Sequence, residues 1–205
     1  MTIISDKPVW AIFLDIDGVL NEGIPSLDKF LAKKKELYPG VSDITPMQMK
    51  RVEAQFLDKQ AVEHLHALIE RISKVAKVVI VLSSVWRSHG EIEAIKNTMF
   101  VDWKFAEYLI DKTPTYRNNA MEKIVLSEWR WKEIRLWLNE CSKKHNIQSY
   151  VILDDYHEFP EKRFVRINCY KLLSEQDVEE ALKKISKPLS VESPEKKIST
   201  DFLFG

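Results

Sequence analysis

The sequence predicts an α/β fold: a three-layer α/β/α sandwich around a mostly parallel, doubly wound sheet. Short apolar segments alternate along the chain with longer segments that have the apolar spacing of helices. Most of the apolar segments are continuous runs, which is typical of strands buried on both faces of a sheet. Strands that alternate with helices at this spacing form a parallel sheet covered by helices on both faces.

Each expected strand is a short run of mainly β-branched, aromatic and other apolar residues. The strands are expected at residues 9–14, 77–82, 108–110, 150–153 and 164–167. The segments between them are long enough for helices, which are expected at residues 26–37, 58–73, 91–99, 130–144 and 174–185. Ser174, followed by Asp177, has the pattern of a helix N-terminus.

Two segments interrupt this alternation. Residues 21–57 separate the first strand from the helix expected to pack on it, with turn signals at Pro39-Gly40 and Thr45-Pro46. An insertion directly after a strand end is placed to cover that end, so residues 21–57 are expected to form a small helical cap. Residues 187–205, rich in Ser, Lys, Glu and Pro, are expected to be a flexible tail, which assigns the core domain to residues 1–186.

The composition argues against several classes of protein. A length of 205 residues fits one domain, and 31 basic against 31 acidic residues argue against a nucleic-acid binder with a broad basic surface. The longest apolar runs are far shorter than a membrane-spanning helix. Two cysteines, Cys141 and Cys169, are too few for a disulfide framework, which favours a reducing compartment. Without a standard secretory signal peptide, a cytoplasmic location is expected, and export by a signal-independent route stays open.

The first strand runs into Asp15-Ile16-Asp17-Gly18, a pair of acidic residues separated by one position. Such a pair can be no more than a turn that ends the strand. A calcium loop is the other simple interpretation, but Val19 and Ser26 stand where that loop requires an oxygen ligand and a glutamate. The other strand ends decide between a turn and a functional site.

Polar residues follow two further strands. Residues 78–82 lead directly into Ser83 and Ser84; a hydroxyl at a strand end is placed to donate to an anion, although one serine can simply cap a helix. Asp154 and Asp155 follow another strand, and adjacent carboxylates repel each other unless a cation or donors lie between them. Ligands of open α/β sheets bind at the carboxyl ends of the strands. The acidic pairs therefore predict a hard cation, with magnesium favoured because the protein supplies few ligands.

In these motifs the chain resembles the haloacid dehalogenase (HAD) superfamily of phosphohydrolases. The first family motif matches Asp15-Ile16-Asp17-Gly18-Val19, the second matches Ser83, with Ser84 as the shifted alternative, and the fourth matches Asp154-Asp155. The stretch that ends at Trp86-Arg87 resembles a small bacterial subgroup whose second motif reads Ser-Ser-x-Trp-Arg. The resemblance covers roughly residues 8–186 and implies a Rossmann-like HAD core.

The third family motif is a Lys or Arg that precedes the fourth-motif strand. The candidates are Lys123, Arg130 and Lys132. In a helix, Arg130 shares its face with Ile134 and Trp137, an apolar stripe expected to face the sheet. We therefore favour Arg130 over Lys132, with an ordinary surface arginine paired with Glu133 or Glu128 as the alternative.

The resemblance implies magnesium-dependent hydrolysis of phosphomonoesters. Asp15 would be the nucleophile that forms an aspartyl-phosphate, and Asp17 would protonate the leaving oxygen and then activate water. Magnesium would be held by Asp15, the main-chain carbonyl of Asp17 and Asp155, while Asp154 acts through water or orients its neighbour. The phosphoryl oxygens would be held by Ser83 or Ser84 and by Arg130 or Lys132.

The resemblance indicates the class of substrate but not its identity. The resemblance implies a phosphorylated substrate, and a cap of this size leaves an opening for a small molecule, a phosphoprotein (including phosphotyrosine), a nucleotide or a nucleic-acid end. Zero net charge makes nucleic acid the less favoured of these. The alternative function is a catalytically idle phosphate-binding or protein-interaction module on the same scaffold.

Overall fold

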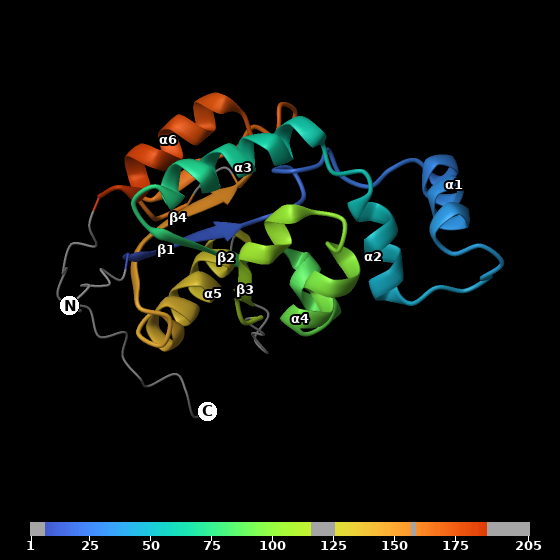
Figure 1. Ribbon diagram of the computed structural model, residues 1–205, viewed down its shortest axis with the longest axis horizontal. Helices are drawn as coiled ribbons and strands as arrows, with labels where there is room; N and C mark the ends of the chain where they lie inside the picture. Colours follow the sequence, from blue (N-terminus) through green and yellow to red (C-terminus); the bar gives the residue numbers. More distant parts are fainter. Residues whose placement is uncertain (1–6, 116–125, 157–158, 188–205) are drawn as a thin grey trace, which may run out of the picture.

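The computed structural model describes residues 7–115, 126–156 and 159–187. Its centre is a parallel sheet of five strands in the order β3-β2-β1-β4-β5. The strands are β1 (Val9–Leu14), β2 (Lys77–Leu82), β3 (Leu109–Lys112), β4 (Ile147–Asp154) and β5 (Phe164–Arg166). Helices α3 (Lys59–Ser73) and α6 (Glu175–Ile185) lie on one face and α5 (Leu126–Cys141) on the other (Figure 1). The predicted three-layer α/β sandwich is confirmed.

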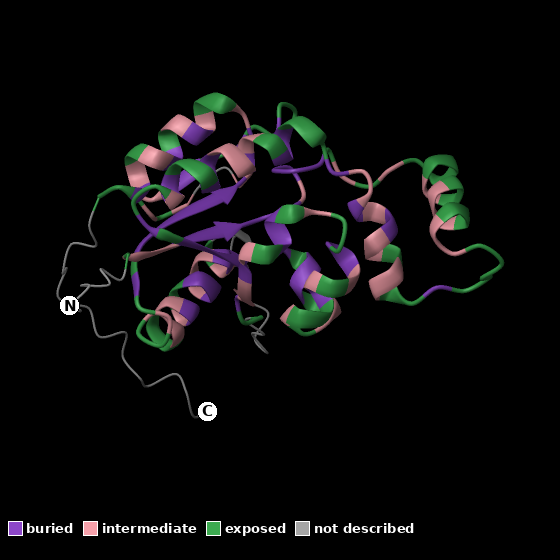
Figure 2. Cartoon of the chain, viewed as in Figure 1, coloured by how far each residue is buried: buried purple, intermediate pink, exposed green. Residues whose placement is uncertain are grey.

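Both faces of the sheet are buried, which explains why its strands are continuous apolar runs (Figure 2). One cluster packs Phe13, Val81 and Ile152 against Ile134 and Trp137 of α5. The other cluster packs the alternate strand residues, such as Ile12, against α3 and α6. The face of α5 that the apolar stripe predicted is therefore the face that meets the sheet.

Several element boundaries differ from the predicted ones. The helix expected at 91–99 is a short α4 (Ile92–Ala94) that continues as a π-helix over Ile95–Met99. The strand expected at 108–110 starts one residue later, after a 3₁₀ helix over Lys104–Tyr108. A further 3₁₀ helix, η1 (Val85–His89), follows β2. The π-helix buries both Ile95 and Met99 in the core cluster that packs on the α3 face of the sheet.

The predicted cap segment, residues 21–57, contains two helices. Helix α1 (Leu27–Leu37) follows the prediction and has no buried residue. Helix α2 (Pro46–Ala54) was not predicted; Thr45 and Gln48 form a capping box around Pro46 at its first position. Both helices lie beyond the carboxyl ends of the strands (Figure 1). The division into core, cap and tail stays a prediction, and nearly all of the tail, 188–205, lies outside the described residues.

The order of the strands locates a binding crevice. From β1 the chain continues to β2 and β3 on one side, and then crosses to β4 and β5 on the other. The direction of winding therefore reverses between β1 and β4, which is where open α/β sheets bind ligands. Among the described helices, none has both the length and the apolar character that crossing a membrane requires.

Candidate active site

The predicted site residues lie in a row along the carboxyl ends of the strands. The backbone N–H of Asp15 donates to Leu153 O at 3.0 Å, and the N–H of Ser83 donates to Leu14 O at 2.9 Å. These bonds continue the sheet register one step past β1 and β2, so Asp15 stands between Ser83 and Asp154. On a strand, residues i and i+2 point to the same face of the sheet. Phe13, Val81 and Ile152 all face α5, and each residue of the row lies two positions after one of them. The side chains of the row therefore start on the face that α5 covers.

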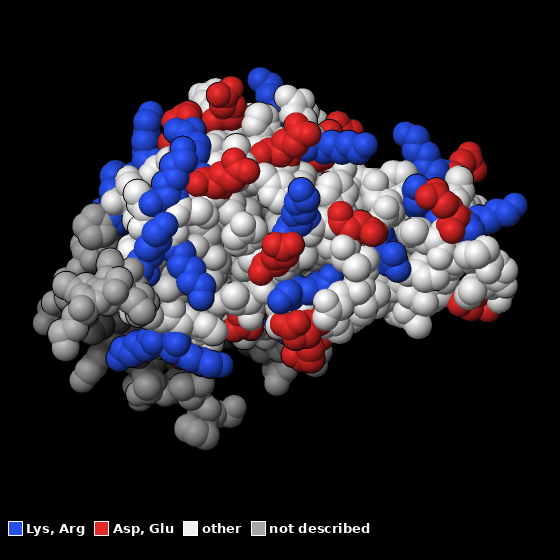
Figure 3. Space-filling model, viewed as in Figure 1, with Lys and Arg blue, Asp and Glu red and all other residues white. Residues whose placement is uncertain are grey.

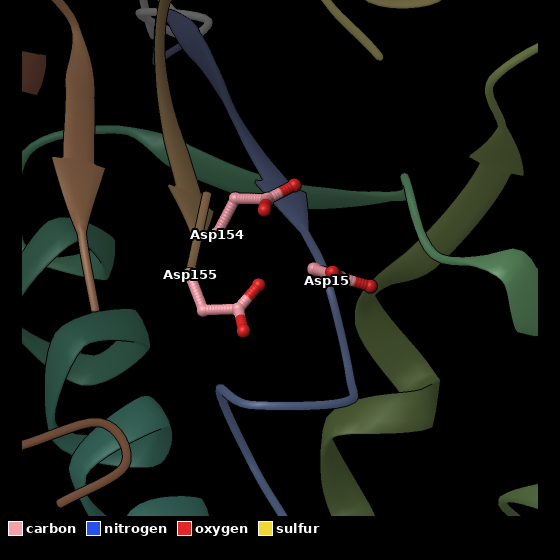
Figure 4. A group of neighbouring side chains, drawn as sticks. All are labelled: Asp15, Asp154 and Asp155. Atoms are coloured by element: carbon pink, nitrogen blue, oxygen red, sulfur yellow. The ribbon is translucent and has the colours of Figure 1, made fainter. Parts of the chain in front are cut away.

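Three carboxylates converge at the switch point (Figure 4). Asp15, at the end of β1, and Asp154 and Asp155, at the end of β4, each offer an oxygen within 4.8 Å of the others. Asp15 is 5% exposed and Asp154 is fully buried. Gly18, with φ of 75°, lies so close that a Cβ there would be 2.3 Å from Oδ2 of Asp155. A side chain at position 18 would therefore displace the Asp155 carboxylate.

The electrostatics of this cluster favour a cation. Burial, together with the nearby Asp15, raises the pKa of Asp154 to about 8, although Arg130 opposes the shift. Burial also raises the pKa of Asp15, again against the effect of Arg130. Oδ2 of Asp154 is buried and accepts no hydrogen bond within the described part of the chain. A divalent cation beside these carboxylates would keep them ionised and would reach that oxygen through a bound water, so the residues present fit a divalent metal site.

If the carboxylate cluster binds magnesium, the metal is expected to raise the temperature of unfolding, and this can be measured without any assay of activity. Magnesium at about 100 times its dissociation constant would stabilise the folded protein by about 2.7 kcal/mol. For a chain of this size that is roughly 5–11 °C in the unfolding midpoint. Asp155→Ala is expected to reduce the shift more than Asp154→Ala does, measured by thermal unfolding with and without MgCl₂. The reverse order would make Asp154 the direct ligand.

Arg130 supplies the positive charge at the site. Its Nη2 lies 3.9 Å from Oδ2 of Asp15, its Nε lies 3.8 Å from Oδ2 of Asp154, and its guanidinium packs over the Tyr156 ring. Burial lowers the pKa of Arg130, but the two carboxylates outweigh it and raise the pKa above its ordinary value. Nη1 is buried and, among the described residues, has no acceptor, so it is available to an incoming anion.

The other third-motif candidates are placed differently. Lys132 is half-buried on α5, and two residues along an α-helix differ in direction by about 200°. Arg130 and Lys132 therefore do not share a face of α5, and the ion contacts to Asp15 and Asp154 come from Arg130. Lys123 lies outside the described residues.

The two serines differ in what they contact. Ser84 hydrogen-bonds to the Asp15 carboxylate through its side chain, and its Oγ also caps η1 by accepting from the Trp86 N–H. Ser83 is 1% exposed, and its Oγ has no hydrogen-bond partner in the described segments. A buried hydroxyl without a partner is costly unless a ligand or water meets it. Ser83 is therefore the better candidate for a phosphoryl contact, and Ser84 orients Asp15.

Asp17 is held by residues that sequence reasoning did not assign to the site. The Trp86 indole Nε1 donates to Oδ2 of Asp17 at 2.9 Å, and the Asn21 amide donates to Oδ1 at 3.1 Å. The carboxylate is thereby fixed apart from the cluster of Asp15, Asp154 and Asp155. Trp86 lies in the stretch that resembles the Ser-Ser-x-Trp-Arg motif, and that motif could have indicated its place in the site. No sequence feature indicated Asn21.

A buried ion pair joins η1 to α5 beneath the site. Nη2 of Arg87 lies 2.5 Å from Oε2 of Glu133, Nη1 donates to the Ser84 carbonyl at 2.7 Å, and both charged side chains are 7% exposed. Burial lowers the pKa of Arg87, and Glu133 partly offsets this. Glu133 was considered as a partner of Arg130; it pairs with Arg87 instead. The pair connects the segment that carries Ser83 and Ser84 to α5, the helix that carries Arg130.

The fold and the strand-end cluster define a HAD-type domain: a parallel sheet with an acidic group at its switch point, and two inserted helices, α1 and α2, after β1. Comparison with protein-family models matches residues 11–178 to the family described as "HAD domain in Swiss Army Knife RNA repair proteins". The chain belongs to this family, which confirms the resemblance. Membership supports a HAD-type enzyme, usually a hydrolase, and the acidic cluster fits its divalent metal. Comparison with curated proteins finds no match.

Proposed function

We propose that the protein is a magnesium-dependent phosphomonoester hydrolase that works through an aspartyl-phosphate on Asp15. The observation that carries the proposal is the set of unsatisfied groups around Asp15. Ser83 Oγ and Arg130 Nη1 are buried donors without described acceptors, and both flank the carboxylate at the end of β1. A phosphoryl group at this place would satisfy both donors while its phosphorus faces a carboxylate oxygen.

The reaction assigned to these residues has two steps. In the first, an oxygen of Asp15 attacks phosphorus, the bond to the ester oxygen breaks, and Asp17 gives that oxygen a proton. In the second, Asp17 takes a proton from water, the resulting hydroxide attacks phosphorus, and the bond to Asp15 breaks to release inorganic phosphate. A cation held by Asp15, the carbonyl of Asp17 and Asp155 would neutralise charge between the nucleophile and the phosphate. Asp154 orients Arg130 and its neighbour Asp155.

The substrate we favour is the terminal phosphate of an RNA strand. The family description, which concerns RNA repair, outweighs the zero net charge that made nucleic acid less favoured. Figure 3 shows basic side chains interspersed with acidic ones over the centre of the drawn face and the cap, so recognition of an end suits the surface better than binding along a strand.

A hollow between the start of the predicted cap segment and the N-terminus of α3 has room for a nucleotide unit. It has a volume of about 660 Å³, which is within the range of ligand pockets, and it begins at Glu22, the residue after Asn21. Its lining includes Ile24, Phe56, Lys29 and Lys59. An aromatic ring with lysines nearby suits a stacked base and its phosphate.

A substrate panel tests the proposal. Hydrolysis of 4-nitrophenyl phosphate is expected to require magnesium and to stop with EDTA. Among natural substrates, RNA oligonucleotides with a 3′- or 5′-terminal phosphate are expected to give a higher kcat/KM than mononucleotides, sugar phosphates or phosphotyrosine peptides. Preference for the peptides would overturn the RNA assignment and keep the phosphatase. Binding of inorganic phosphate without turnover of any substrate would instead show an idle module.

Replacing each of the two basic residues of α5, Arg130 and Lys132, by alanine tests which of them contacts the phosphoryl group. Arg130→Ala removes a charge-assisted contact to the phosphoryl oxygens and is expected to lower kcat/KM by about 100-fold, or roughly 3 kcal/mol. Lys132→Ala, the matched control on the same helix, is expected to change kcat/KM by less than about 3-fold. Steady-state kinetics with 4-nitrophenyl phosphate measure both. An impaired Lys132→Ala beside an active Arg130→Ala would reverse the assignment.

A further inference from the structure

Trp86 connects the strand-end site to the cap segment. Its indole Nε1 donates to Oδ2 of Asp17 at 2.9 Å, and the side chain is fully buried. The Phe100 ring stacks on it, with centroids 5.6 Å apart and planes at 6°. Nζ of Lys50, from helix α2, lies 4.6 Å from the centre of the indole ring. The position of the N–H that reaches Asp17 therefore depends on packing from both the core and α2.

The chemistry of the indole makes this contact a directional one. An indole N–H donates a hydrogen bond and cannot accept one, so the carboxylate oxygen that it contacts is always the acceptor. The Asn21 amide fixes the other oxygen at 3.1 Å. Together the two donors set the plane of the Asp17 carboxylate. An acid must lie within hydrogen-bond reach of the oxygen that it protonates, and a displacement of about 1 Å can cost about 100-fold in rate.

We propose that Trp86 is a positioning residue for Asp17, and that Lys50 makes this positioning depend on helix α2 of the cap segment. The proposal rests on the proposed function, because it concerns the proton that Asp17 gives to the leaving oxygen. Lys50 is held toward the ring from its own helix, where its Nζ also lies 2.5 Å from Oε2 of Glu53. A cation over an indole face attracts the ring, so the place of α2 influences the place of the Nε1–H.

The leaving group provides the test. An aryl phosphate such as 4-nitrophenyl phosphate has a leaving group that departs without a proton, whereas an alkyl phosphate such as glycerol phosphate needs the acid. Trp86→Phe keeps an aromatic ring and removes the N–H. It is expected to lower kcat/KM for the alkyl phosphate by about 10- to 100-fold and for the aryl phosphate by about 3-fold or less. Competitive inhibition by inorganic phosphate is expected to stay unchanged, because Trp86 is not assigned to the phosphoryl group.

Trp137→Phe is the matched control. Trp137 is also buried and also donates an indole N–H to an aspartate, Asp111, at 2.8 Å, but that aspartate is not part of the cluster. The control is expected to lose a similar amount of stability and to keep the wild-type ratio of alkyl to aryl kcat/KM. Lys50→Met is expected to shift the ratio in the direction of Trp86→Phe, by about 3-fold.

The outcomes separate the inference from the function on which it rests. Wild-type protein that hydrolyses neither ester overturns the proposed function and this inference with it. An active wild type whose alkyl-to-aryl ratio is unchanged by Trp86→Phe overturns the inference alone. An equal loss with both esters in Trp86→Phe and Trp137→Phe would show a merely structural tryptophan. Should Trp86→Phe fail to fold, the ratio in Lys50→Met decides, and an unchanged ratio there overturns the inference.

Discussion

Asp15→Asn is expected to abolish turnover while leaving the fold intact. An amide cannot attack phosphorus to form an acyl-phosphate, and removal of a catalytic nucleophile costs on the order of 10⁴-fold or more in rate. Asparagine has nearly the same shape, and its Oδ1 can still accept the Ile16 N–H, which reaches Asp15 Oδ1 at 2.8 Å. Because burial raises the pKa of Asp15, a neutral side chain is well tolerated at this place.

Covalent labelling gives the direct measurement. Wild-type protein mixed with a ³²P-labelled phosphomonoester and quenched in acid is expected to retain label, and Asp15→Asn is expected to retain none. Asp111→Asn is the matched control: it changes a strand-end aspartate of β3 that accepts from Trp137 and lies outside the carboxylate cluster. It is expected to keep both label and turnover. Near-normal turnover by Asp15→Asn would remove the nucleophile from Asp15.

Arg87→Met is expected to give the largest loss of stability. It removes the cation paired with Glu133, a carboxylate that is 7% exposed and 2.5 Å from the guanidinium. Leaving one member of a buried pair costs about 3–5 kcal/mol in the free energy of unfolding, or roughly 6–20 °C in the unfolding midpoint. Chemical denaturation measures the free energy directly. Magnesium should be held constant, because metal binding stabilises the fold on its own.

Two further variants identify the cause of that loss. Arg87→Met combined with Glu133→Met removes both charges and is expected to recover much of the stability. Arg71→Met breaks an ion pair with Glu179 in which both side chains are exposed, and is expected to change stability little. If Arg87→Met lowers the free energy of unfolding by no more than Arg71→Met does, the buried pair contributes no more to stability than an exposed one.

The architecture was predictable because burial on both faces restricts what a strand can contain. Residues 9–14 and 77–82 were predicted with the boundaries that β1 and β2 have, since a polar residue from position 11 onward in β1 or from position 78 onward in β2 would lie in the core. The same logic located the strand-end residues, because the first polar residue after a buried strand falls at the edge of the sheet. Parallel strands in register then place Asp15, Ser83 and Asp154 in one row.

Elements outside the sheet were less predictable. Helix α2 was missed although Thr45-Pro46 and Gln48 are the signal for its start, because a turn and a helix N-terminus use the same residue types. The helix expected at 91–99 is a short α-helix that continues as a π-helix over Ile95–Met99, whose two end residues are buried in the core. Such boundaries depend on what the segment contacts, and local residue preferences do not contain that information.

Three features follow from the amino-acid sequence alone: the parallel α/β class, the strand ends that carry Asp15, Ser83 and the acidic pair, and the face of α5 that carries Arg130. Those features depend on the period of strands and helices and on the position of the first polar residue. Two contacts of the site require the three-dimensional structure: Trp86 holds Asp17, and Glu133 pairs with Arg87 rather than with Arg130. These contacts join residues 69 and 46 positions apart, and only the packing of whole elements brings such residues within a hydrogen bond of each other.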